Sequence, residues 1–291
     1  TSITATDADL PAQTLSYSIV GGTDSALFSI NSSTGEMTFI TAPDFEAPSD
    51  AGLDNIYNVT VQASDGTLET AQDLAVTVTA VNDNTPVITS VNVLNVPENL
   101  PAVTAIIASD ADLPAETLTY SIAGGLDSTL FNINSSTGEL TFITPPDFEI
   151  PNDAGLDNIY NVTVQAFDGT LSVTQDMVIT VTEVNDNTPI STSVDEFTVS
   201  ENTSSVTTIT ATDADLPAQT LTYSIAGGSD ATRFSINSST GILTFITSPD
   251  FEAPTDMGLD NTYNVIVRAS DGTLSTTKDL VVTVAPQPVV P

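Results

Sequence analysis

The chain has 291 residues, of which 38 are acidic and only 3 are basic, so its formal net charge is −35. It contains no His and no Cys, which excludes disulfides and makes zinc or copper sites unsuitable, and almost nothing is present to neutralise the phosphates of a nucleic acid. Disorder is excluded as well, because 40% of the residues are apolar and they alternate with polar ones. No apolar run approaches the ~20 residues of a membrane helix.

The chain contains an internal sequence repeat that occurs nearly three times. Asp7-Ala8-Asp9 recurs at 110–112 and at 213–215, a spacing of 103 residues. This period is too long for a solenoid and predicts tandem domains, with boundaries at 1–84, 85–187 and 188–291. The first repeat lacks a counterpart of residues 91–103, so we interpret the chain as a processed or excised piece of a longer protein whose first domain lacks its opening strand.

Strands are predicted throughout each repeat. In the second repeat they fall at residues 91–96, 103–108, 118–122, 131–133, 140–142, 160–166 and 177–181. Tyr160, Val162 and Val164 alternate with polar residues, as in a half-buried strand. Gly138 suits a positive φ in a bulged hairpin, and Asp168-Gly169 predicts a tight turn. Seven strands in about 100 residues predict an all-β fold of tandem Greek-key sandwiches, immunoglobulin-like and arranged end to end.

The acids lie in motifs rather than at random. Asp-x-Asp, Asp-x-Glu and Asn-Asp-Asn are dense sources of carboxylate and carbonyl oxygens, of which calcium takes six to eight. Alternate residues of an extended strand point to one side, so Asp110 and Asp112 are expected to converge on one ion. Because the first two repeats contain no basic side chain, a bound cation is the predicted neutralising charge.

Five motifs in a constant order resemble the cadherin repeat. In the second repeat they are Pro-Glu-Asn at 97–99, Asp-Ala-Asp at 110–112, Asp-Phe-Glu at 147–149, Ala-Phe-Asp-Gly at 166–169 and Val-Asn-Asp-Asn-Thr-Pro at 184–189. The resemblance covers essentially the whole chain. Asp-Phe-Glu-x-Pro at 147–151 and Asp-Asn-x-Tyr-Asn-Val at 157–162 look most like cadherin-type repeats of large bacterial surface and adhesin proteins.

This resemblance implies calcium ions between consecutive repeats, where they stiffen the junction. At the first junction the implied ligands are Asp44, Glu46, Asn82, Asp83 and Asn84, with Asp110, Asp112 and Asp168 from the second repeat. At the second junction they are Glu98, Asp147, Glu149, Glu183, Asn185, Asp186 and Asn187, with Asp213, Asp215 and Asp271 from the third repeat.

Some positions depart from the family pattern. The acid that opens the linker is Glu183 at the second junction but Ala80 at the first, so the first junction is expected to bind its lower ions more weakly. After the third repeat Ala-Pro-Gln-Pro at 285–288 replaces Asn-Asp-Asn, and Glu201 is expected to lack a linker partner, as are Asp250 and Glu252.

Other acids recur without matching any ligand of the family. Asp24, Asp50, Asp54 and Asp73, with their counterparts in the second repeat, are expected to be solvated surface residues. The alternative is that the loop at 50–54 holds a further ion.

The predicted function is a non-enzymatic, calcium-rigidified module of the cell surface, a stalk or filament segment used in adhesion. The alternative is a carbohydrate- or ligand-binding surface module. An enzyme is not expected, because no base lies near a candidate nucleophile. The predicted partners are calcium, neighbouring repeats and further copies in filaments, the tail at 284–291 of one copy filling the open edge of another. Nucleic acid and a membrane span in this segment are not expected.

Overall fold

The computed structural model describes residues 1–287. Contacts divide the chain into two compact units: Thr1–Asn92 with Thr104–Thr141 and Val162–Met177, and Val93–Val103 with Phe142–Asn161 and Val178–Pro291. The middle repeat contributes to both. No α-helix occurs in the described residues, only three short 3-10 turns, so none of their helices is long enough to cross a membrane.

The described part of the third repeat, up to residue 287, has nine strands. They are β15 (Ile190–Ser191), β16 (Glu196–Ser200), β17 (Ser205–Thr208), β18 (Ala211–Thr212), β19 (Thr222–Gly227), β20 (Phe234–Ile236), β21 (Ile242–Phe245), β22 (Thr262–Ser270) and β23 (Ser275–Ala285), with the turn η3 (Ala231–Arg233) between β19 and β20. One sheet has the order β16-β23-β22-β19 and the other β17-β21-β20, while β15 pairs with β18.

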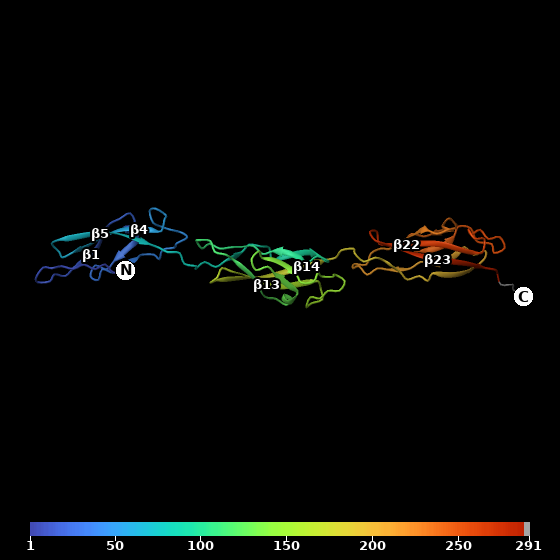
Figure 1. Cartoon of the computed structure of the whole chain (residues 1–291), viewed down its shortest axis with the longest axis horizontal. Coiled ribbons are helices and arrows are strands. Elements are labelled where there is room, and N and C mark those ends of the chain that lie inside the picture. The colour runs from blue at the N-terminus through green and yellow to red at the C-terminus, as the bar shows by residue number, and fades with distance from the viewer. Residues whose placement is uncertain (288–291) are drawn as a thin grey trace. The chain divides into compact units, whose positions relative to one another are not determined.

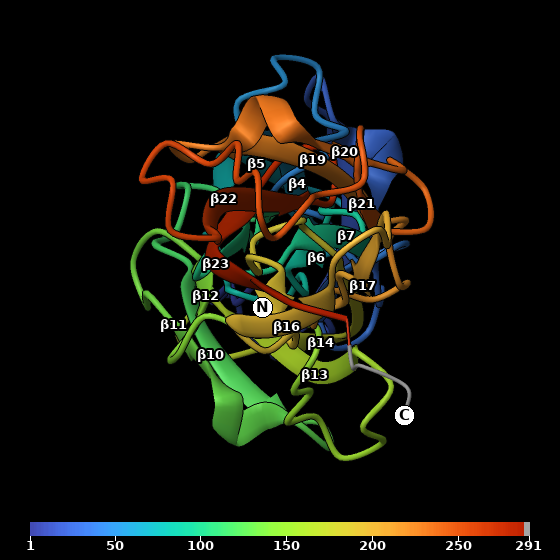
Figure 2. The same ribbon diagram turned by 90° about the vertical axis from the view of Figure 1, so that its right-hand side faces the viewer.

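The longest pairing joins β22 and β23 from Thr262↔Thr283 to Ser270↔Ser275, and the two strands lie side by side in the orange and red part of the chain (Figure 1). The turn between them contains Asp271 and Gly272 in the position where Asp-Gly predicts a tight turn. On its other side β23 pairs in parallel with β16, which lies beside it in Figure 2.

The core of the third repeat lies between its two sheets. Val265, Val282 and Leu243 are at most 1% exposed and come from β22, β23 and β21. The ring of Tyr263 meets that of Phe245 edge-on, with centroids 5.1 Å apart. Alternate residues of a strand point to opposite faces, so the period-2 pattern places every second side chain of these strands in the core.

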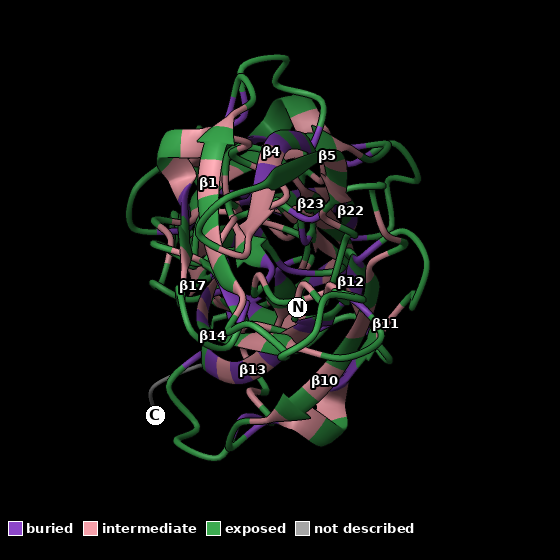
Figure 3. Cartoon of the chain, turned by 90° about the vertical axis from the view of Figure 1, so that its left-hand side faces the viewer, coloured by how far each residue is buried: buried purple, intermediate pink, exposed green. Residues whose placement is uncertain are grey.

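From β1 and β10 onward, the first two repeats follow the same order of elements as the third does from β19. The first has β1 (Ser16–Gly21), β2 (Phe28–Ile30), β3 (Met37–Phe39), β4 (Ile56–Ser64) and β5 (Glu69–Thr77), with η1 (Ser25–Leu27). The second has β6 (Val87–Ile88), β7 (Val93–Pro97), β8 (Ala102–Ala105), β9 (Ala108–Ser109), β10 (Thr119–Gly124), β11 (Phe131–Ile133), β12 (Glu139–Phe142), β13 (Ile159–Phe167) and β14 (Ser172–Thr182), with η2 (Ser128–Leu130). Buried residues alternate along β4, as the purple bands of Figure 3 indicate.

The first repeat differs from the others at an edge of each sheet, because β2-β3 also has no third strand in the described chain where β8 and β17 pair in the later repeats. Its sheet has the order β1-β4-β5, and among residues 1–287 no strand pairs with β5 where β7 and β16 pair in the later repeats. Leu74 and Val76 on β5 are accordingly half-buried, whereas Met177 and Ile179 on β14 are at most 1% exposed. The side chains of β5 are therefore covered less completely by neighbouring strands than those of β14.

The all-β prediction is confirmed, and each of the seven predicted strands of the second repeat has a counterpart in β7, β8, β10, β11, β12, β13 and β14. The prediction missed one additional short pair, β6 with β9. The positive φ of Gly138 is also confirmed at 71°, and a Cβ there would lie 2.3 Å from the Ile106 carbonyl oxygen.

The predicted donor tail is wrong in part. Val284 and Ala285 belong to β23 and pair with Val199 and Ser200 of their own repeat. Both residues therefore already pair within their own repeat. Residues 288–291 lie outside the described part of the chain.

Candidate metal centres at the repeat junctions

The Asp-Ala-Asp motif lies outside the strands, directly after β9, so its two acids are not aligned by an extended strand as predicted, although their carboxylates do come within 4.8 Å of each other. The backbone N–H of Asp112 donates to Asp110 Oδ1 at 3.0 Å, directly after β9 ends. Asp-Phe-Glu is folded in the same way, since the N–H of Glu46 donates to Asp44 Oδ1 at 2.9 Å. Hydrogen bonds from backbone N–H groups to these side chains shape the chain into a loop. The loop, rather than the pleat of a strand, orients the carboxylates.

The first junction brings acids from two repeats together. The carboxylates of Glu46, Asp83 and Asp112 each offer an oxygen within 4.8 Å of the others, and so do those of Asp110, Asp112 and Asp168. Asp112 belongs to both groups and is only 3% exposed. A single carboxylate shared between two acidic groups is what two adjacent cations would require.

Hydrogen bonds connect the linker to these acids. The backbone N–H and the side-chain amide of Asn84 donate to Asp112 Oδ1 at 3.2 and 2.7 Å, and the amide contact is the main reason that the pKa of Asp112 lies below its ordinary value. Glu46 Oε1 accepts the N–H of Leu113 at 3.1 Å. Residues 28 and 67 positions apart in sequence are therefore held together.

The second junction repeats this design with a further acid. Glu98, Asp147 and Glu149 form one group and Glu149, Asp186 and Asp215 form another. Glu98 is 2% exposed and accepts the backbone N–H groups of Phe148 and Val184, both at 2.7 Å. Burial, together with the charges of Glu98 and Asp215, raises the pKa of Glu149. The ionised form of Glu149 is thus disfavoured until a positive charge arrives.

The other predicted ligand residues of the second junction form hydrogen bonds with the linker or lie next to it. Leu216 N–H donates to Glu149 Oε1 at 3.1 Å, and the N–H and amide of Asn187 donate to Asp215 Oδ1 at 3.1 and 2.9 Å. Asp271 Oδ1 accepts two N–H groups of its hairpin turn, at 2.6 and 2.7 Å. Glu183, in contrast, is exposed.

Several oxygens at both junctions are buried without a hydrogen-bond donor. Among the described residues these are Asn82 Oδ1, Asp110 Oδ2 and Asp168 Oδ2 at the first junction, and Asn185 Oδ1, Asp213 Oδ2, Asp215 Oδ2 and Asp271 Oδ2 at the second. Buried acceptors without a partner are costly unless something positive meets them. Hard oxygen donors of this kind, with no nitrogen or sulfur ligand among them, fit calcium.

The basic side chains do not fill this role. Within residues 1–287 one ion pair is formed, between Lys278 Nζ and Asp195 Oδ2 at 3.7 Å, and neither residue belongs to a junction group. The junction acids are therefore not neutralised by the protein.

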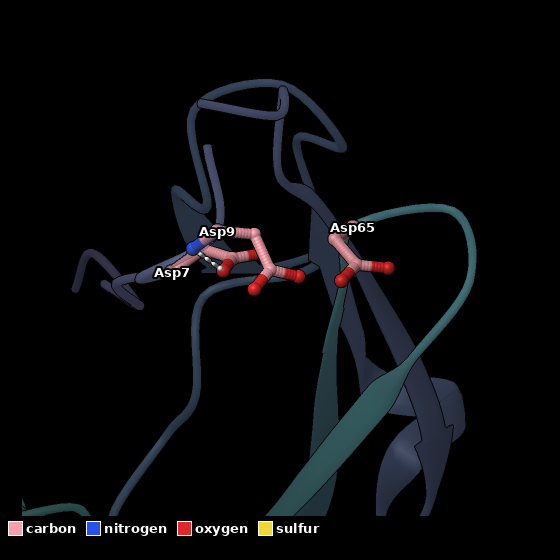
Figure 4. Close-up of side chains that lie close together, drawn as sticks. All are labelled: Asp7, Asp9 and Asp65. Atoms are coloured by element: carbon pink, nitrogen blue, oxygen red, sulfur yellow. Dashed lines mark hydrogen bonds between the residues drawn. The ribbon is translucent and has the colours of Figure 1, made fainter. Parts of the chain in front are cut away.

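Sequence reasoning missed one further acidic group. Asp7, Asp9 and Asp65 bring their carboxylates together in the first repeat (Figure 4). They stand 103 positions before Asp110, Asp112 and Asp168, so the repeat period was the signal that could have identified them.

At the other end of the chain Glu201 was expected to lack a linker partner, and this expectation is wrong. Glu201 Oε1 accepts the N–H of Gln287 at 2.8 Å and Oε2 accepts that of Phe251 at 3.2 Å. A backbone N–H suffices for this contact, so the bond forms although the Asn-Asp-Asn sequence is absent.

Four of the eight acids predicted to be solvated are instead buried: Asp24 and Asp50, with their second-repeat counterparts Asp127 and Asp153. Asp24 and Asp50 are 3% and 2% exposed, whereas Asp54 and Asp73 are exposed as predicted. Asp50 accepts the N–H groups of Gly52, Asp54 and Asn55 at 2.9 to 3.1 Å. This carboxylate organises its loop from within.

The loop serves the junction through one amide. Asn55 Nδ2 donates to the Phe45 carbonyl oxygen at 2.9 Å, and Phe45 stands between Asp44 and Glu46. The same contact recurs from Asn158 to Phe148 and from Asn261 to Phe251. The buried Asn55 side chain thereby fixes the backbone that carries two candidate ligands.

The Asp256 loop predicts a specific acid sensitivity. Burial opposes ionisation of Asp256, but hydrogen bonds from Asp260 and Asn261 outweigh it and lower its pKa below 3.8. Its stabilising contribution is therefore complete above pH 3.8 and is lost as the pH falls through the lower folded-state pKa. Asp256→Asn should lower the melting temperature by about 10 °C at pH 7 and by much less at pH 2, in melts with chelator present. Exposed Asp279→Asn is the control, and an equal effect at both pH values would contradict the assignment.

Comparison with known proteins supplies the family. The model of the cadherin domain matches residues 1–81, 92–182 and 195–285. The mouse Cadherin EGF LAG seven-pass G-type receptor 2 is 31% identical over 97% of this chain and 10% of that protein, and mouse Cadherin-23 is 33% identical over 88% of this chain and 8% of that protein. The chain thus spans about a tenth or less of these curated relatives.

Solved structures agree. Repeats EC22-24 of mouse Cadherin-23 superpose with a TM-score of 0.62 at 26% identity, covering 97% of this chain and 89% of that one. The Protocadherin gammaB7 EC3-6 structure gives a TM-score of 0.61 at 26% identity, covering 94% and 67%.

The expected similarity to bacterial adhesins is not what these comparisons find, since the relatives are animal cadherins. The match is to a family of adhesion domains rather than enzymes, whose members lie at the cell surface, in agreement with the predicted extracellular location. With three matched domains in tandem and an all-β fold like that of solved cadherin repeats, this chain belongs to the cadherin family.

Proposed function

We propose that this chain is a calcium-binding, calcium-rigidified segment of an extracellular adhesion protein, a stalk or filament in which ions occupy the junctions between domains 1–84, 85–187 and 188–291. The single observation that carries the proposal is the set of buried, unpartnered oxygens at the two junctions. A bound calcium ion supplies the positive charge that these oxygens lack.

The residues that would hold the ions come from both repeats at each junction. At the first they are Asp44, Glu46, Asn82, Asp83, Asn84, Asp110, Asp112 and Asp168, and at the second Glu98, Asp147, Glu149, Glu183, Asn185, Asp186, Asn187, Asp213, Asp215 and Asp271. Two carboxylates about 4 Å apart repel each other by roughly 4 kcal/mol near a protein surface. Without a cation this repulsion favours separation of the repeats. A bound cation attracts the carboxylates of both repeats and so holds the repeats together.

The carbohydrate-binding alternative gains no support. Such sites use several exposed aromatic rings, whereas among residues 1–287 Phe167 alone is an exposed aromatic, and Tyr57, Tyr160 and Tyr263 are at most 1% exposed. Self-assembly into filaments remains part of the proposal.

Small-angle scattering tests the stiffening. In millimolar calcium, above the roughly 10⁻⁴–10⁻³ M dissociation constants of extracellular calcium modules, we expect one well-defined maximum dimension. Chelator should broaden the distance distribution, because junction acids that repel each other allow many orientations. Magnesium at the same concentration is the control for ionic strength, since its strict octahedral preference suits these sites poorly. Identical distributions with calcium and with chelator would refute the proposal.

A further inference from the structure

One hairpin turn has the same sequence in all three repeats. Asn-Ser-Ser-Thr-Gly occupies residues 31–35, 134–138 and 237–241, between β2 and β3, β11 and β12, and β20 and β21. The first four residues of the turn are exposed in every repeat. Asn-x-Ser, where x is not proline, is the acceptor pattern for N-linked glycosylation, and it is expected on surface loops of secreted proteins. None of these residues belongs to the proposed calcium sites.

The turn uses only one end of the asparagine amide. Asn31 Oδ1 accepts the backbone N–H groups of Ser33 and Thr34 at 3.0 and 3.2 Å. Asn134 Oδ1 and Asn237 Oδ1 accept the equivalent pairs of N–H groups at 3.0 to 3.2 Å. A backbone N–H can only donate, so the amide oxygen has to face it and the NH₂ group is the end that the turn leaves unused. Within residues 1–287 no acceptor binds these three NH₂ groups, and their nitrogen is the atom to which a glycan is attached.

Attachment of a glycan at this nitrogen preserves the turn. The modification replaces one amide hydrogen and keeps the carbonyl oxygen, so both hydrogen bonds of the oxygen persist. The turn itself has one conformation in all three repeats, since its glycines Gly35, Gly138 and Gly241 have φ of 68°, 71° and 70°, which few other residues adopt. The hairpin therefore presents the same amide nitrogen at the same place in each repeat.

Two Asn-x-Thr triplets, at residues 58–60 and 161–163, lie in central strands instead. β4 pairs with β1 on one side and β5 on the other, and the Thr60 hydroxyl already donates to Asp73 Oδ1 at 2.6 Å. The equivalent hydroxyl of β13 is bound in the same way at 2.7 Å. A strand held between two neighbours is closed to a modifying enzyme once the sheet forms, whereas an exposed hairpin turn stays accessible. One more triplet, at residues 202–204, has no counterpart in the second repeat.

We propose that Asn31, Asn134 and Asn237 are N-linked glycosylation sites, so that each repeat carries a glycan at the same hairpin. The donor is an oligosaccharide joined to a lipid diphosphate. The bond from Nδ2 to the first sugar carbon forms as the bond from that carbon to the phosphate oxygen breaks, and the amide proton leaves with the lipid diphosphate. These sites are separate from the calcium sites, so each proposal can fail without the other.

Mass spectrometry of the full chain secreted from animal cells tests the assignment, and animal cells are the host because the relatives are animal cadherins. Peptide N-glycosidase in heavy-oxygen water converts each glycosylated asparagine into labelled aspartate. We expect the label at Asn31, Asn134 and Asn237. Ser33→Ala removes the hydroxyl of the pattern and leaves both hydrogen bonds of Asn31 Oδ1 in place, so it should abolish the label at Asn31 alone.

Ser32→Ala is the matched control, because it removes an exposed hydroxyl from the neighbouring position and keeps the pattern. Its label at Asn31 should equal that of the wild type. Hairpin asparagines without label, or label at Asn58 and Asn161 in their place, would overturn the assignment. A label at Asn31 that persists in Ser33→Ala would overturn it as well, since that label would come from spontaneous deamidation and not from a glycan.

Discussion

Asp215→Asn is expected to remove most of the stabilisation that calcium provides through the second junction. Asp215 is 1% exposed, and its Oδ2 is buried without a hydrogen-bond donor in the described chain. At a calcium concentration 100 times the dissociation constant, mass action stabilises the folded state by about 2.7 kcal/mol per site, or on the order of 10 °C for one domain. The measurement is the melting temperature of variant and wild type across a calcium titration, with chelator as the zero point.

The matched control is Asp279→Asn, which makes the same change in charge on an exposed residue in the middle of β23. It should retain the full calcium-dependent rise. In chelator Asp215→Asn should equal or exceed the wild type in stability, because the substitution relieves repulsion from Glu149 and Asp186. A calcium-dependent rise in Asp215→Asn equal to that of the wild type would exclude this carboxylate as a ligand.

Leu243→Ala is expected to destabilise the third repeat by about 2–5 kcal/mol, with or without calcium. Leu243 is 0% exposed on β21 and packs in the core cluster that contains Val265 and Val282. Removing its side chain leaves a cavity that neighbouring strands cannot close, because their positions are fixed by hydrogen bonding in both sheets. The change is measured as the midpoint of urea unfolding.

Ile246→Ala is the control for this prediction, since Ile246 follows the same strand but is 65% exposed. It should change the free energy of unfolding by less than about 0.5 kcal/mol. If the two variants unfold at the same urea concentration, the assignment of the core face of β21 is wrong. The calcium response should remain in both, which distinguishes loss of packing from loss of a ligand.

The strands could be predicted because period 2 is a local property. Tyr160, Val162 and Val164 alternate with polar residues, and each is at most 1% exposed in β13. The turn at Gly138 was equally accessible, since few residues other than glycine adopt its φ of 71°.

The candidate site was predictable as a set of residues but not as an arrangement. Glu46, Asp83 and Asp112 stand far apart in sequence and meet because the linker N–H groups bind Asp112 and the Leu113 N–H binds Glu46. Asp50 was misjudged as solvated because an isolated carboxylate in a Gly-containing segment gives no sign that three backbone N–H groups will enclose it.

Residue order alone therefore determined the tandem organisation, the all-β fold and the excess of acid without base, since repeat period, alternation and net charge are properties of the chain itself. Tertiary structure alone decided which carboxylates share a site and which are enclosed by their own loop. The physical reason is that hydrogen bonds and repulsion between carboxylates act over a few ångströms, a distance that folding creates between residues that the sequence separates.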